Sequence, residues 1–154
     1  MSRFRIDVAD LLHHPGARRT VRLSEPVDDL AGSAAVVPDP VAVVLDLERI
    51  NEGIVVRGAV TATWRGDCAR CLTPLTRALE LHVDELFEPD PVAGETYPLE
   101  GHELDLEQLV RDAVLLELPL APHCVPPCPM PAQAVDDAAP DVDPRWRALS
   151  ELEL

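Results

Sequence analysis

An alternation of apolar and polar side chains predicts paired strands in the middle of the chain. Residues 41–47 are apolar and β-branched, as in a buried strand. Residues 54–64 are rich in Val and Thr, with Gly58 as a candidate β-bulge, and residues 75–87 mostly alternate. The last two segments flank a Cys-x-x-Cys sequence at residues 68–71. We therefore expect an antiparallel hairpin with these cysteines at or near its tip.

A stripe of leucine and valine predicts one main helix. Apolar side chains recur at a helical spacing from Leu106 to Leu118. Asp105 is a suitable N-cap with Gln108 at the capping-box spacing, and Pro119 ends the pattern. The second half of the helix is apolar on nearly all sides. This favours burial against the sheet over an exposed partner surface, because a domain of this size needs a helix over one sheet face.

Weaker signals lie on either side of these elements. Residues 3–8 and 20–23 could form short extended pieces, with a His-His-Pro-Gly turn signal between them. Several Pro and Gly residues within 88–103 predict a loop. No internal repeat is present, and a chain of 154 residues fits one domain, so we place these segments in the same domain as the hairpin and the helix.

Together the elements predict an α+β fold. The domain spans residues 1–128 and contains an antiparallel β-sheet that could close toward a barrel, with one main packed helix. Residues 129–154 are expected to form a flexible acidic C-terminal tail, in which residues 129–142 are a linker. Residues 143–152 could form a short helix that presents Trp146, Leu149 and Leu152 on one face. That helix could fold back on the domain or serve as a docking peptide.

The acidic composition narrows the choice of partners. The 154-residue chain has a formal net charge of −15 at pH 7 and contains no lysine. Simple coating of nucleic acid is disfavoured, because it needs cations that neutralise phosphates, and a basic partner is favoured. Arginines still gather at two places: Arg18 and Arg19 near the N-terminus, and Arg65 and Arg70 beside the hairpin tip. With Trp146, they are our candidate contacts to RNA or to a partner protein.

The absence of targeting signals predicts a cytoplasmic protein. No stretch approaches the ~20 apolar residues that span a bilayer, so we expect no membrane partner. The N-terminus lacks the apolar region of a secretory signal. In the cytoplasm, the four cysteines are expected to be reduced thiols or metal ligands rather than disulfides.

The four cysteines form two close pairs, Cys68 with Cys71 and Cys124 with Cys128. Four thiolates around Zn²⁺ would close a tetrahedral structural site and fix the segment after the helix to the hairpin. His123 could replace one thiolate. The alternative is four ordinary reduced thiols whose spacing arises by chance. A redox role is disfavoured, because thioredoxin-type pairs begin a helix whereas Cys68 and Cys71 lie between expected strands.

Catalytic motifs are absent from the sequence. The five histidines have no Ser or Cys partner at a motif spacing, and neither a Gly-rich nucleotide fingerprint nor a phosphate loop occurs. Asp and Glu are so abundant that most are expected to form a solvated face. We therefore expect a protein that is not an enzyme and has no small-molecule substrate.

Several motifs resemble one family when their order and spacing are taken together. The most specific is the run Trp-Arg-Gly-Asp-Cys-Ala-Arg-Cys-Leu that ends at Leu72. The similar segments are residues 58–72, 85–87, 104–106 and 114–120, the region of Cys124, and residues 143–152. The whole pattern is similar to the YceD-like family, the large ribosomal RNA subunit accumulation proteins. The similarity covers most of the chain and is weakest over residues 1–40.

The resemblance implies a role in the accumulation of large-subunit ribosomal RNA, and so in ribosome assembly in bacteria and plastids. Its implied partners are the large-subunit precursor, its rRNA or a basic ribosomal protein, and no enzymatic activity is established for the family. Many members carry further cysteines after the second pair, whereas Pro129 follows Cys128 here. A metal site would therefore be limited to Cys68, Cys71, Cys124 and Cys128.

Three functions follow from these observations. The first is a non-enzymatic factor that binds rRNA or a ribosomal protein during biogenesis of the large subunit, and the net charge favours its protein-binding version. The second is a zinc-stabilised structural adaptor whose partner docks on Trp146, Leu149 and Leu152. The third, disfavoured above, is a thiol oxidoreductase that uses Cys68 and Cys71.

Overall fold

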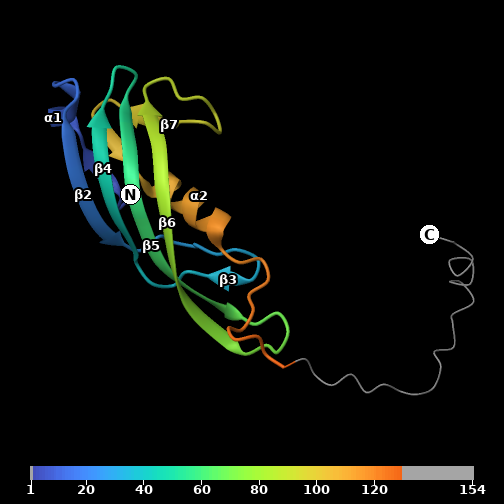
Figure 1. Ribbon diagram of the computed structural model, residues 1–154. Helices are drawn as coiled ribbons and strands as arrows, with labels where there is room; N and C mark the ends of the chain where they lie inside the picture. The colour runs from blue at the N-terminus through green and yellow to red at the C-terminus, as the bar shows by residue number, and fades with distance from the viewer. Residues whose placement is uncertain (1, 130–154) are drawn as a thin grey trace, which may run out of the picture.

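A computed structural model describes residues 2–129 of the chain. Figure 1 shows a curled sheet with one longer helix packed on it. The elements in chain order are β1 (Arg5–Asp7), α1 (Ala9–Leu12), β2 (Arg18–Glu25), β3 (Ala35–Val36), β4 (Val41–Arg49), β5 (Ile54–Asp67), β6 (Pro74–Glu88), β7 (Tyr97–Glu100), β8 (Glu103–Asp105) and α2 (Glu107–Glu117). Neither of these two helices is long and apolar enough to cross a membrane.

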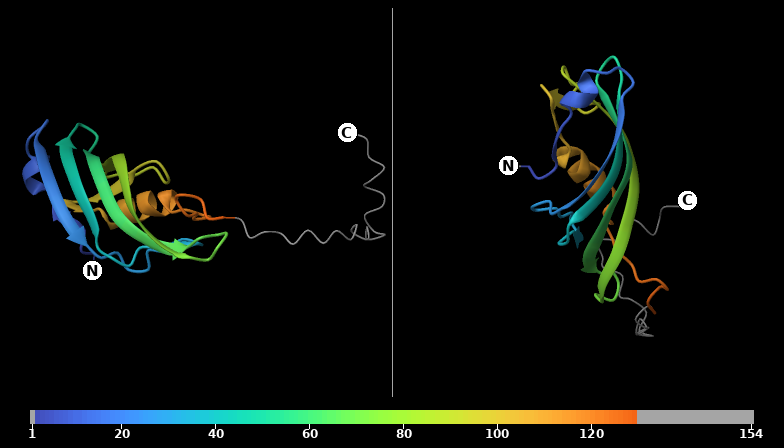
Figure 2. Two further views of the ribbon diagram at one scale, coloured as in Figure 1. Left: turned by 60° about the horizontal axis from the view of Figure 1, so that its bottom comes forward. Right: turned by 90° about the vertical axis from the view of Figure 1, so that its left-hand side faces the viewer.

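The strands form one sheet in the order β1-β8-β7-β6-β5-β4-β2, and β3 pairs with β5 beside this path. Every pairing is antiparallel except that of β6 with β7, which runs parallel at Phe87↔Tyr97 and Glu88↔Pro98. The β5–β6 hairpin is the longest ladder and extends from Ile54↔Phe87 to Asp67↔Pro74. The sheet curves into an open half-barrel, with α2 on its concave side (Figure 2).

Alternating side chains place the core on the concave face of this sheet. Val41, Val43, Leu45 and Leu47 of β4 are buried, while the residues between them are half-buried or exposed. β5 repeats the pattern, because successive residues of a strand point to opposite faces. The convex face carries the intervening residues of β2, β4, β5 and β6, which are mostly small, polar or charged and include the exposed Val44. It is covered by no other element within residues 2–129 (Figure 2).

Helix α2 completes the core through Leu109, Val110 and Val114, which are all buried. The N-cap is Leu106 rather than the expected Asp105, although Oδ1 of Asp105 accepts a hydrogen bond of 3.0 Å from the backbone N–H of Glu107. The capping box is not formed, because the Gln108 side chain donates to Asp112 at 2.7 Å instead. Burial of the whole second half was also wrong: Leu116 is 85% exposed.

The prediction of a mainly antiparallel sheet with one main packed helix is confirmed. The expected barrel stays open, since the strand path ends at β1 and β2. Residues 88–103 are not all loop, because β7 and the first residue of β8 lie there. Gly58 is not a bulge either, as the β4–β5 and β5–β6 registers pass through it without an extra residue.

Predictions for the C-terminal part fall on residues 130–154, which lie outside the described residues. They are the acidic linker, the terminal helix and Trp146 on its face. The domain boundary at residue 128 likewise stays a prediction.

Candidate metal centre

The first cysteine pair lies in a compact turn that closes the β5–β6 hairpin. The backbone N–H of Cys68 donates to the Thr73 carbonyl at 2.9 Å, and that of Leu72 donates to the Cys68 carbonyl at 2.9 Å. Leu72 has a left-handed backbone with φ of 59°, which reverses the chain direction after Cys71. The backbone N–H of Arg70 points at the Cys68 sulfur, 3.5 Å away. Local backbone bonds therefore aim both sulfurs to the same side of the turn.

The second cysteine pair is brought to this turn by the segment that follows α2. The backbone N–H of Ala69 donates to the Pro122 carbonyl at 2.7 Å. Arg77 of β6 donates to the His123 carbonyl at 2.5 Å, and its guanidinium lies 5.9 Å from the centre of the buried Trp64 ring. The expected attachment of this segment to the hairpin is thus present in the backbone as well as at the sulfurs.

The four cysteine sulfurs all lie within 4.8 Å of one another. Two contacts join the two pairs: Cys68 to Cys128 at 3.8 Å and Cys71 to Cys124 at 3.5 Å. Sulfurs of a tetrahedral zinc site are about 3.8 Å apart, because each Zn–S bond is about 2.3 Å. All four cysteines are free thiols rather than disulfides. The sulfurs are therefore placed to hold one metal ion, and His123 is not part of this group.

The surroundings of the sulfurs favour different protonation states in the two pairs. Backbone N–H groups of Cys71 and Arg70 lower the pKa of Cys68 to about 5. The Thr73 hydroxyl, 3.2 Å from the Cys71 sulfur, lowers the pKa of Cys71. The hydrogen bond with Cys71 raises the pKa of Cys124 to about 12, and burial is the main cause that raises the pKa of Cys128. The hairpin pair thus loses its protons more readily than the second pair, and a bound cation would favour the thiolate form of all four.

The candidate arginines occupy two separate places. Arg65 forms an ion pair with Asp39 at 2.9 Å, while the exposed Arg70 at the hairpin tip makes no ion pair within residues 2–129. Arg18 pairs with Glu48 at 2.8 Å and Arg19 with Asp10 at 2.9 Å. The β2–β4 and β5–β6 registers put Arg18 and Arg19 at the opposite end of the sheet from the cysteines. These arginines therefore do not form one basic surface.

Sequence reasoning missed Thr73 as a partner of the cysteine cluster. Its only sequence signal is its position two residues after Cys71, where the chain leaves the turn. The role of Arg77 in holding the His123 carbonyl was also missed, because residues 77 and 123 are far apart in the sequence and only the fold brings them together.

The chain belongs to the family described as "Large ribosomal RNA subunit accumulation protein YceD", which matches residues 56–153. The match includes both cysteine pairs, β5, β6 and α2. Membership therefore rests on the hairpin, the metal centre and the helix rather than on β1 to β4.

Similar proteins occur in mycobacteria. Uncharacterized proteins of Mycobacterium tuberculosis and Mycobacterium bovis are each 35% identical over 165 residues, which cover 96% of this chain and 80% of the relative. An uncharacterized protein of Mycobacterium leprae is 32% identical over 166 residues, with 95% and 76% covered. No solved structure matches the chain. The names of these relatives give no family, partner or mechanism, so the family assignment rests on the match over residues 56–153.

Proposed function

We propose that this protein is a non-enzymatic cytoplasmic factor in biogenesis of the large ribosomal subunit, and that it supports the accumulation of large-subunit rRNA. In this proposal it binds either rRNA or a basic ribosomal protein on the precursor particle. The observation that carries the proposal is membership of the YceD family over residues 56–153.

The cysteine cluster supports a structural rather than a catalytic role. We propose that the four thiolates hold Zn²⁺. Four protein ligands close a zinc site, so no coordination position is left for water or a substrate. Such an ion would fix the segment after α2 to the hairpin tip. That leaves the exposed Arg70 next to a rigid surface, where it can contact a partner.

Loss of the gene tests the ribosomal role. In a bacterium that encodes this chain, depletion should reduce large-subunit rRNA relative to small-subunit rRNA. It should also enlarge the peak of precursor particles, which sediment more slowly than the mature large subunit in a sucrose gradient. Re-expression of the protein should restore both. Unchanged rRNA ratios and gradients after complete depletion would refute the ribosomal role.

Metal analysis tests the proposed zinc. Protein purified without a histidine tag should contain about one Zn²⁺ per chain, and Cys71→Ser or Cys124→Ser should lose it. The matched control is Ser33→Cys, an added exposed thiol outside the cluster, which should leave the zinc content unchanged. Purification of the wild-type protein under reducing conditions without any metal would refute the site.

The zinc-stabilised adaptor is the second candidate function, and the convergence of the four sulfurs favours it. It predicts bound zinc together with a normal gradient after depletion. The thiol oxidoreductase predicts instead that the wild-type protein reduces disulfides and that Cys71→Ser abolishes this activity. If the protein binds zinc and does not reduce disulfides, the oxidoreductase is excluded. The ribosomal factor and the zinc-stabilised adaptor then remain.

A further inference from the structure

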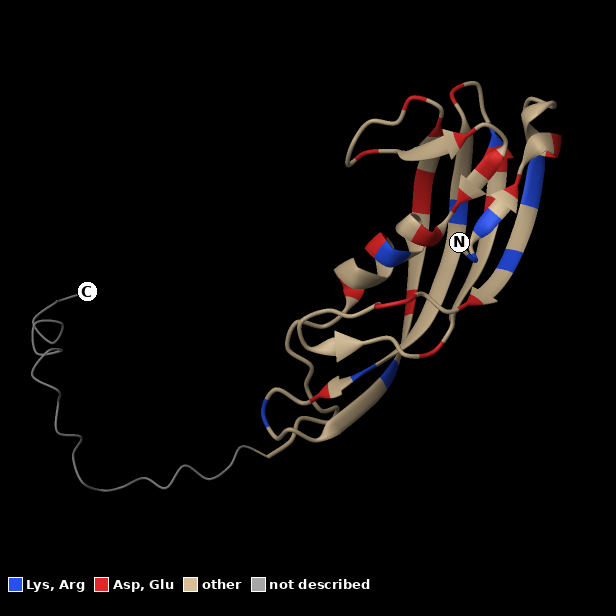
Figure 3. Cartoon of the chain, turned by 180° about the vertical axis from the view of Figure 1, so that it is seen from behind, with Lys and Arg blue, Asp and Glu red and all other residues tan. Residues whose placement is uncertain are grey.

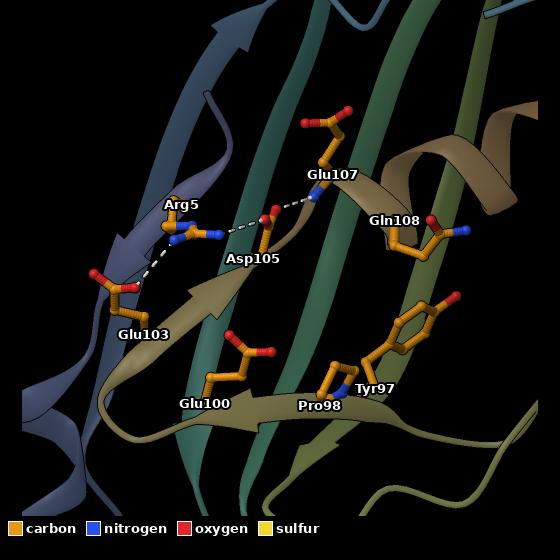
Figure 4. A pocket seen from close by; sticks show the side chains of 8 residues that line it. All are labelled: Arg5, Tyr97, Pro98, Glu100, Glu103, Asp105, Glu107 and Gln108. Atoms are coloured by element: carbon orange, nitrogen blue, oxygen red, sulfur yellow. Dashed lines mark hydrogen bonds and ion pairs between the residues drawn. The ribbon is translucent and has the colours of Figure 1, made fainter. Parts of the chain in front are cut away.

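Two adjoining hollows run along β7 and the start of α2. One has a volume of about 380 Å³ and the other about 620 Å³, and both are lined by Tyr97, Pro98 and Gln108. Figure 4 shows the smaller one, where β8 leads into α2 and carboxylates of both elements surround the opening. The hollows adjoin at these three shared residues, and we call the two together the β7–α2 groove.

Carboxylates dominate the lining of the β7–α2 groove. Seven acidic residues and one basic residue, Arg5, line the groove. Arg5 lies 3.4 Å from Glu103 and 3.6 Å from Asp105, and Arg111 of α2 lies 3.5 Å from Glu107. The acidic residues are Glu85, Glu95, Glu100, Glu103, Asp105, Glu107 and Asp112. Figure 3 shows this concentration of Asp and Glu around β7, β8 and α2. The groove therefore has a negative potential that attracts cations and repels phosphates.

The phenol of Tyr97 lies in the middle of this negative potential. Its hydroxyl donates to Asp112 at 3.1 Å, and its ring stacks on Phe87 at 5.1 Å. Its ring lines both hollows, so a guanidinium or ammonium group in the groove can lie over the ring face as well as between carboxylates. The lining thus suits Arg or Lys side chains of a partner.

One end of the groove is apolar. Leu115 and Leu116 line the larger hollow, and Leu116 is 85% exposed. Leu120, just past the helix, is 83% exposed. Exposed leucines beside a groove are typical of sites that bind another polypeptide. Together with the carboxylates they require a partner that is both basic and apolar.

A metal ion is a poor alternative occupant. Within residues 2–129, the group of His, Cys, Asp and Glu side chains placed to share one ion is the cysteine cluster, not the groove carboxylates. Nucleic acid is disfavoured by its phosphates. A basic polypeptide satisfies both the charges and the exposed leucines.

We propose that the β7–α2 groove binds a basic segment of a large-subunit ribosomal protein. Arg or Lys side chains of the segment lie among the carboxylates, and its apolar side chains contact Leu115 and Leu116. This inference rests on the proposed ribosomal function, and it chooses protein over rRNA as the partner at this surface.

Binding to charge-reversed variants tests the groove. Full-length protein is immobilised and exposed to the protein fraction of purified, ribonuclease-treated large subunits. Glu95→Arg and Glu100→Arg, both exposed, should each retain about fivefold less of the bound basic protein than wild type. Glu80→Arg is the matched control, because this exposed residue lies on the convex face and gives the same change of charge. It should retain the wild-type amount.

A second pair of variants tests the apolar end. Leu116→Ser should weaken retention, while Val44→Ser should not, because the exposed Val44 lies on the convex face. Equal retention by wild type and all groove variants, or no retained ribosomal protein, overturns the proposal. The proposal is also overturned if the wild-type protein retains protein-free large-subunit rRNA and the groove variants do not, because the groove would then bind RNA.

Two other occupants give distinct results. If a second copy filled the groove, wild-type protein would dimerise and Glu100→Arg would be a monomer. If the basic residues of the chain's own C-terminal part filled it in place of a partner, the wild-type protein would retain no ribosomal protein. Either result overturns the proposal.

The ribosomal function fails separately. A normal gradient after depletion refutes that function even if the groove binds basic protein. Conversely, full complementation by Glu95→Arg and Glu100→Arg variants in a depleted strain with abnormal gradients overturns the groove proposal alone.

Discussion

Gly58 occupies a point of β5 where the backbone of β4 comes unusually close. Its φ is 151°, and a Cβ at this position would overlap with the carbonyl oxygen of Val44. We expect Gly58→Ala to destabilise the protein by about 3 kcal/mol, because the clash is with backbone in the middle of two ladders. Gly94→Ala is the control: its φ is 80° but nothing lies within 4 Å, so its cost should be about 1 kcal/mol. Urea unfolding measures both, and equal costs would contradict the close approach.

Tyr97 reports the charge of its surroundings through its own ionisation. Burial, followed by the charge of Asp112, raises the pKa of Tyr97 to about 12. The neutral phenol is favoured in the folded state, so its contribution to stability is present below about pH 10 and is lost as pH rises toward about 12. Asp112→Asn should move the pKa back toward about 10. Tyr97 is the only tyrosine, so tyrosinate absorbance measures it directly. An unchanged pKa in Asp112→Asn, with Glu80→Gln as control, would contradict this account.

At the scale of elements, the segment after α2 depends on β6 for its position. Arg77 donates to the His123 carbonyl and lies over Trp64, so it fixes the residue next to Cys124. We expect Arg77→Met to speed the release of bound zinc to a chelating dye about tenfold, as for other groups that orient metal ligands. Arg57→Met is the control, because Arg57 pairs with Asp84 at 2.9 Å on the convex face. Equal release rates for the two variants would show that Arg77 does not support the metal centre.

The elements differ in how well the sequence predicts them. The β5–β6 hairpin is predictable because its alternating pattern extends over a long ladder that buries one face. β7 and β8 are not, because they are four and three residues long and depend on pairing with distant strands. The exposure of Leu116 is also not predictable from the sequence, because a stripe of leucines does not indicate how far a sheet extends beneath a helix. Local patterns thus predict the long elements and miss those that tertiary contacts create.

At the scale of the whole molecule, the cysteine cluster was predictable and the β7–α2 groove was not. Two close cysteine pairs predict convergence on one ion, although the cross-pair contacts of Cys68 with Cys128 and of Cys71 with Cys124 need the fold. The groove carboxylates are spread from Glu85 to Asp112 among many other acidic residues. In a chain with a net charge of −15, such residues carry no local signal.

The cysteine cluster lies at one end of the sheet, apart from the main core. The continuous cluster of buried side chains extends from β4 and the first half of β5 as far as Ala62 and Trp64, and it includes no cysteine. Removal of the metal should therefore loosen the hairpin tip and residues 119–128 while the rest of the sheet stays folded. These two segments can open without unfolding of the core. Hydrogen exchange with and without a chelator should show lost protection in those two segments and retained protection in β4. Cys124→Ser should give the same pattern without a chelator. Loss of protection throughout β4 would mean instead that the metal is required for the fold as a whole, as in domains that are unfolded without zinc.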